Sequence, residues 1–162
     1  MTAAPDYSAQ GREGETLAPT LRSAHEIWVR EADRYLLPVA TQEAPFWNRW
    51  TTVRYLADQF MAQYRRECAL LLELHSFLTP DVAERLTLDG DRIGGLVAEL
   101  DRVGRRRGSA QTVSVVSQRL LSAVRAWCAD IESAAGSIPL DLLTPEGRES
   151  LLDLERYVSI HA

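Results

Sequence analysis

The chain has 162 residues, of which 46% are hydrophobic and 25% charged, a composition close to that of one average globular domain. Its apolar runs are short and its N-terminus lacks the basic start and apolar block of a secretory signal, so we expect a cytoplasmic protein without a membrane span. The formal net charge of −5 disfavours attraction of the whole surface to nucleic acid or anionic lipid, and two cysteines exclude a disulfide scaffold.

The first half of the chain predicts a leader followed by two helices. Residues 1–19 contain two prolines and two glycines and predict a flexible leader, ahead of a single helical domain over 20–162. Apolar residues then recur every three or four positions from Leu21 to Tyr35, and Pro38 ends or kinks this helix. The strongest pattern runs from Phe46 to Leu78, with spacings that alternate between four and three.

Three more helices are predicted in the second half. Helix starts are indicated by Thr79 with Pro80, by Ser109, and by Thr144 with Pro145. The apolar stripes include Val82, Leu86, Ile93, Val97 and Leu100, then Val113, Leu120, Val124, Trp127 and Ile131, then Leu151, Leu154 and Val158. No stretch alternates with the period of a strand, so the sequence predicts an all-α fold, an up-and-down four-helix bundle with an additional C-terminal helix.

Glu67 is the one ionisable residue in the long apolar stripe, and a buried carboxylate needs a partner. Helix reversals near residues 42, 79 and 106 would place Arg92 level with Glu67, which predicts a Glu67–Arg92 ion pair, with Arg119 as second choice. Two alternatives remain open, a cavity in which Glu67 binds a cationic ligand and a rotated helix that exposes it. His25 lies on the apolar face of the first helix, where a hydrogen bond to a neighbour is the more frequent role.

The usual signatures of enzymes and metal sites are missing from the sequence. None of the three histidines has a glutamate three residues before it, so the Glu-x-x-His pairs of di-iron bundles are absent. Neither Cys68 nor Cys128 has the spacing of a redox or metal motif, and we expect inert thiols. The sequence therefore predicts no catalytic residue, no metal and no cofactor.

Two glycines and several aromatic residues leave a ligand cavity open as an alternative. Gly90 and Gly94 share one face of a helix, which favours close approach of a neighbouring helix over a hinge beside a ligand. The alternative function is a small-molecule binder or enzyme with an aromatic cavity and with Glu67 or His25 as its polar anchor. The aromatic residues expected to line it are Trp28, Tyr35, Phe60, Tyr64 and Trp127.

The leading interpretation is a non-enzymatic protein that acts through protein contacts, as an adaptor, a regulator or a subunit of an assembly. The turn Arg105, Arg106 and Arg107 is expected at the same end of the bundle as Trp47 and Arg49, and tryptophan beside arginine is typical of interfaces. We expect an acidic protein segment as partner, with a homo-oligomer also compatible, and neither nucleic acid nor membrane. Against this, three arginines at a helix end can simply complement the helix dipole, and Ser109 behind them could hold a phosphate.

Overall fold

The computed structural model describes residues 14–43 and 46–161, without the side chains of residues 46–52 and 56. Within these residues the chain forms an all-α helical bundle without strands, which confirms the predicted fold class. The helices are α1 (Ala18–Ala40), α2 (Phe46–Leu74), α3 (Pro80–Arg105), α4 (Ala110–Ala135) and α5 (Pro145–His161), with short 3-10 turns η1 (His75–Phe77) and η2 (Leu140–Leu142). None of the described helices combines the length and the hydropathy needed to cross a membrane.

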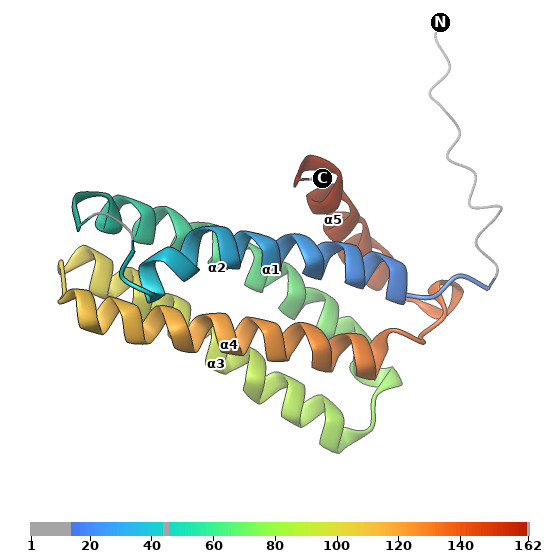
Figure 1. Ribbon diagram of the computed structural model, residues 1–162. Helices are drawn as coiled ribbons and strands as arrows, with labels where there is room; N and C mark the ends of the chain where they lie inside the picture. The colour runs from blue at the N-terminus through green and yellow to red at the C-terminus, as the bar shows by residue number, and fades with distance from the viewer. Residues whose placement is uncertain (1–13, 44–45, 162) are drawn as a thin grey trace, which may run out of the picture.

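The four long helices lie side by side and run in alternating directions, whereas α5 crosses them at a steep angle (Figure 1). Most contacts join α1 to α4, α4 to α3 and α3 to α2, while α1 and α2 touch each other little. The fifth helix packs against both α1 and α2 and buries Leu151, Leu154 and Tyr157. It therefore fills the space that α1 and α2 leave between them.

Local sequence signals explain where the helices begin. The Ser109 hydroxyl accepts a hydrogen bond from the backbone N–H of Thr112 at 3.1 Å, and the Thr144 hydroxyl accepts one from Gly147 at 3.0 Å. Thr79 stands at the start of α3 as expected, but its side chain makes no capping hydrogen bond. Pro38 does not end α1, because the helix continues for two more residues to Ala40.

The first helix begins inside the segment that the sequence assigned to the leader. Leu17, just before α1, is wholly buried, and its backbone N–H donates to the carbonyl of Ile138 at 3.0 Å. The N–H of Leu140 donates in turn to the carbonyl of Glu15 at 2.9 Å. Residues 14–19 are thus tied to the connection between α4 and α5, and residues 1–13 of the predicted leader lie outside the described residues.

Close helix packing accounts for two glycines of α3, which runs unbroken past both. A Cβ atom on Gly90 would lie 3.0 Å from the ring of Trp127, and one on Gly94 would lie 2.9 Å from the ring of Tyr64. The missing side chains let α4 and α2 place these rings directly against the α3 backbone. Trp127 and Tyr64 therefore pack directly on α3. The two glycines serve close helix packing and not a hinge.

Candidate functional site

A buried histidine at the centre of the bundle lies between two carboxylates from different helices. His25 of α1 is 2% exposed, with its Nδ1 atom 2.7 Å from Oε1 of Glu132 in α4 and its Nε2 atom 3.3 Å from Oε2 of Glu67 in α2. Ionised carboxylates only accept hydrogen bonds, so both ring nitrogens must donate. This geometry fits a protonated imidazole ring.

The surroundings of His25 favour that protonated form. Burial alone lowers the pKa of His25, but the hydrogen bond and charge of Glu67, followed by those of Glu132, outweigh burial and raise the pKa above its ordinary value. Glu67 is wholly buried, and its other oxygen accepts a hydrogen bond from Nε2 of Gln63 at 2.8 Å. We call Glu132, His25, Glu67 and Gln63 the polar row. It connects α4, α1 and α2.

The structure corrects the predicted partner of Glu67. Arg92 and Arg119 are both exposed, and the carboxylate pairs with His25 instead. The reversal near residue 79 gives the height of Glu67 against α3 correctly, since Gly90 and Gly94 of α3 lie beside Cys68 and Tyr64 of α2, but a shared height alone does not make a contact. A reversal point also says nothing about helix rotation, which here turns Glu67 toward α1.

Two members of the polar row were missed in the sequence. Gln63 is 1% exposed and lies one helical turn before Glu67, a spacing that places the two side chains on one face. Glu132 follows the buried Ile131 directly and has a side chain that is 31% exposed. The position of Gln63 was a usable signal, whereas nothing in the sequence set Glu132 apart from the other surface carboxylates.

The polar row is a chain of hydrogen bonds that links three helices through the core. Its carboxylates lie on opposite sides of the imidazole ring, and in the described part of the chain no group of His, Cys, Asp and Glu is placed to hold a metal ion. Burial, followed by the charges of Glu67 and Glu132, raises the pKa of the Cys128 thiol strongly, so this thiol stays protonated and is no nucleophile. Burial also raises the pKa of Cys68.

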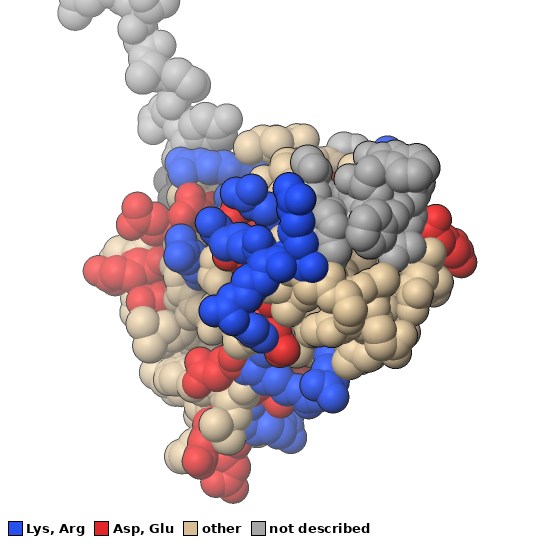
Figure 2. All heavy atoms as spheres, turned by 90° about the vertical axis from the view of Figure 1, so that its left-hand side faces the viewer, with Lys and Arg blue, Asp and Glu red and all other residues tan. Residues whose placement is uncertain are grey.

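Exposed arginines gather at one end of the bundle, around the turn between α3 and α4. Figure 2 looks onto this end and shows a blue patch near its centre. We call the patch the arginine end; its described members are Arg54, Arg102, Arg105, Arg106 and Arg107. Arg105 pairs with Asp101 at 2.7 Å and Arg102 approaches Glu99 at 3.7 Å, whereas Arg106 and Arg107 form no ion pair with any described residue.

The turn itself holds an arginine in an unfavourable backbone conformation. Backbone bonds from Gly108 to Val103 at 3.0 Å and from Arg107 to Gly104 at 3.2 Å close α3 in a Schellman motif. Arg107 has a φ of 50°, a left-handed conformation that glycine normally adopts at this position. The turn after α1 holds Gln42 at a φ of 60°, and the Gln42 side chain donates to Gln111 of α4 at 3.3 Å.

Both turns thus lie at the same end of the bundle, as expected from the reversal points. Trp47 and Arg49, the other residues expected on this surface, have side chains outside the described residues.

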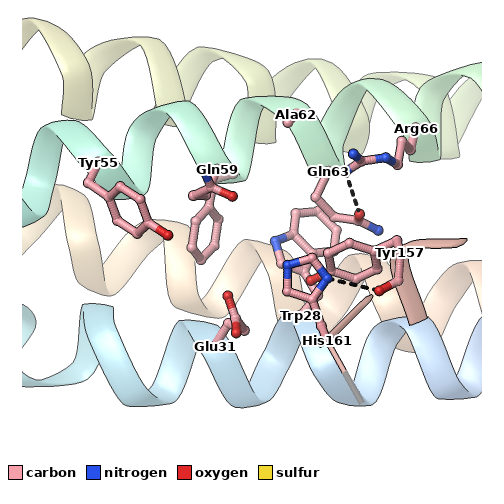
Figure 3. A pocket seen from close by; sticks show the side chains of 10 residues that line it. Trp28, Glu31, Tyr55, Gln59, Ala62, Gln63, Arg66, Tyr157 and His161 are labelled. Atoms are coloured by element: carbon pink, nitrogen blue, oxygen red, sulfur yellow. Dashed lines mark hydrogen bonds between the residues drawn. The ribbon is translucent and has the colours of Figure 1, made fainter. Parts of the chain in front are cut away.

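Two hollows open between the helices. A cavity of about 50 Å³ lies between α1, α2 and α5 (Figure 3). Its lining includes Trp28, Glu31, Phe60, Gln63, Tyr157 and His161. A wider surface groove of about 620 Å³ runs along α1 and α4 above His25 and Glu132.

The cavity differs from the one that the sequence suggested. Trp28 and Phe60 do line it, but Tyr35, Tyr64 and Trp127 do not. Neither His25 nor Glu67 serves it as a polar anchor, because both are occupied within the polar row.

Comparison of the chain with protein-family models, with curated proteins and with solved structures finds no match.

Proposed function

We propose that this protein is a non-enzymatic cytoplasmic helical bundle that acts through protein contacts, as an adaptor, regulator or assembly subunit, and that the arginine end is its contact surface. The observation that carries the proposal is the exposed run Arg105, Arg106 and Arg107, with Arg107 in a left-handed conformation. An ordinary residue in this conformation costs roughly 1–2 kcal/mol that glycine would avoid. An arginine kept at that cost is best explained by a use for its side chain.

The chemistry of the arginine end favours an acidic protein segment as partner. Arginine side chains bind carboxylates through two parallel hydrogen bonds, and Arg106 and Arg107 have no carboxylate partner among the described residues. A nucleic acid would depend on this one patch of a chain with a net charge of −5, which gives weak and strongly salt-dependent binding. An acidic segment needs fewer ion pairs and can add apolar contacts.

Retrieval of partners by the tagged protein tests the proposal. Arg105→Ser with Arg106→Ser and Arg107→Ser should abolish retrieval. The matched control, Arg65→Ser with Arg85→Ser and Arg92→Ser, removes the same charge from other exposed positions and should leave retrieval intact. Equal retrieval by both triple variants would place the contact surface elsewhere.

A defined probe then tests the partner class. A fluorescent peptide rich in Asp and Glu should bind the unchanged protein and the control variant, with an affinity that falls as salt is added, and should fail to bind the arginine-end variant. Tight binding of duplex or single-stranded DNA at physiological salt would contradict an acidic protein partner. Light scattering on the same samples measures whether the partner is a second copy of the chain.

A further inference from the structure

Several aromatic rings line the cavity between α1, α2 and α5. The rings of Trp28 and Phe60 lie 6.0 Å apart and are tilted by 50°, and Tyr157 of α5 also lines the cavity. The Arg66 guanidinium stacks on the Tyr157 ring at 5.4 Å and donates to Gln63 at 3.4 Å, so it is held at the wall. An occupant therefore meets aromatic rings together with polar groups.

One wall of the cavity carries a hydrogen-bond donor without an acceptor. Trp28 is 2% exposed, and its indole nitrogen has no hydrogen-bond partner among the described residues. In Figure 3 the nitrogen-bearing edge of this ring faces the space beside Glu31 and Gln59. An indole N–H can only donate, and leaving a buried donor unpaired is unfavourable. An occupant that places an acceptor atom beside this N–H would therefore bind favourably.

The same cavity presents acceptors that lack donors. No described residue forms a hydrogen bond or ion pair with the Glu31 carboxylate, which lines the cavity from α1. Nδ1 of His161 lies 2.8 Å from the backbone carbonyl of Tyr157 and must donate to it, so Nε2 is the ring nitrogen left for another partner. An occupant must therefore donate a hydrogen bond as well as accept one.

We propose that this cavity binds the hydroxyl group of a small, uncharged amphipathic alcohol. The hydroxyl oxygen accepts from Trp28 and the hydroxyl hydrogen is donated to Glu31, so one group satisfies both sides. A cation would leave the indole N–H unpaired, and an anion would face the Glu31 carboxylate. This site does not overlap the arginine end, so a test of one proposal does not decide the other.

The size of the cavity limits which part of the alcohol enters. A dry cavity that holds benzene has a volume of about 150 Å³, whereas this one has about 50 Å³. Only the hydroxyl end and the carbon next to it fit inside. The apolar remainder would lie in the mouth beside Tyr55 and Gln59, both of which are exposed.

Three matched probes test the assignment: benzyl alcohol, benzylammonium and benzoate share a ring and differ in charge. The readout is the indole ¹⁵N–¹H signal of Trp28 in the full-length protein, assigned with Trp28→Phe. Benzyl alcohol should shift this signal saturably, with a roughly millimolar dissociation constant, and should leave the other three indole signals in place. Stronger binding of benzylammonium or benzoate, or no selective shift with any probe, would overturn the proposal.

Two substitutions separate the hydrogen bonds from the walls. Trp28→Phe keeps an aromatic wall but removes the donor. The affinity for benzyl alcohol, measured here from the ring signals of the alcohol itself, should fall roughly five- to tenfold. Glu31→Gln removes the charge of a partly exposed side chain, keeps the fold intact, and should weaken binding several-fold. The control Glu26→Gln changes an exposed carboxylate of the same helix outside the cavity and should have no effect. Unchanged affinity in Glu31→Gln would contradict the assigned acceptor.

Discussion

The polar row and the arginine end both concentrate charge, yet they use it in opposite ways. In the polar row, His25 and Glu67 are buried and every charged oxygen or nitrogen named above has a hydrogen-bond partner. At the arginine end the side chains are exposed, and their few ion pairs lie in water, where such pairs contribute little to stability. Charge in the first region serves the fold, and charge in the second remains available to another molecule.

Removing one member of the polar row should have the largest effect of any change considered. Glu67→Leu leaves His25 with an unpaired ring nitrogen in the core and should lower the free energy of unfolding by about 3–5 kcal/mol. The double change Glu67→Leu with His25→Leu should recover much of that loss, because no buried charge is then left without a partner. Urea denaturation of the single and double variants measures this coupling.

A matched pair serves as control. Glu67→Leu with Arg92→Leu should show simple additivity, since the exposed Arg92 does not contact Glu67 in the polar row. Coupling of Glu67 with Arg92 but not with His25 would show that the polar row is wrongly described.

Deprotonation disturbs the same cluster without removing an atom, so its effect should be smaller. Because the folded pKa of His25 is raised, the stability it contributes is complete below the ordinary pKa of histidine and is lost as pH rises through the folded pKa. The melting temperature should therefore decline on the alkaline side. The thiols of Cys68 and Cys128 also have raised pKa values, so they too lower the stability of the fold as pH rises. The contribution of His25 is therefore the difference between the melting-temperature profiles of the unchanged protein and of His25→Gln. Identical pH profiles for the two proteins would contradict a protonated His25.

Packing around the polar row gives a third contrast. Gly90→Ala places a methyl group 3.0 Å from Trp127, a fully buried ring without room to move, and should cost about 1–3 kcal/mol. Gly95→Ala, on the same helix, meets nothing within 4 Å and should stabilise by up to about 1 kcal/mol. Thermal unfolding of the two variants should thus shift in opposite directions, and equal shifts would show that α3 does not approach α4 as closely as described.

The smallest expected effect belongs to the arginine end. Arg107→Gly relieves the left-handed conformation and should raise the free energy of unfolding by no more than about 1 kcal/mol, because glycine also loses more freedom on folding. The melting temperature should rise by about 2–4 °C per kcal/mol while binding of the acidic peptide weakens. A variant that gained stability and kept full binding would remove the argument that Arg107 is retained for its side chain.

Periodicity was enough to predict the helices, because the spacing of apolar residues reports directly which face of a helix is buried. Ser109 and Thr144 cap α4 and α5 as their sequence context predicted. The boundary near residue 19 was less accurate, since Leu17 is held by backbone hydrogen bonds to the distant Ile138. Such contacts leave no trace in local composition.

The candidate sites were harder to predict than the helices. Sequence analysis identified Glu67 and His25 as unusual, but it assigned Glu67 to Arg92, because helix rotation depends on how all five helices pack together. The cavity beside Trp28 was missed in its present form for a related reason. Part of its lining comes from Tyr157 and His161 of α5, a helix that the sequence placed only loosely alongside the bundle.

The pairing of α1 with α4 has a consequence for how the chain is made. During synthesis α1 emerges first, yet the helix it packs against most is the fourth, and the helix that covers its other side is the last. The contacts among α2, α3 and α4 join neighbours in sequence and can form early, whereas those of α1 must bridge about a hundred residues, the separation between His25 and Glu132. On the ribosome, the face that α1 buries against α4 therefore has no native partner until α4 has appeared, so this contact belongs to the late steps of folding.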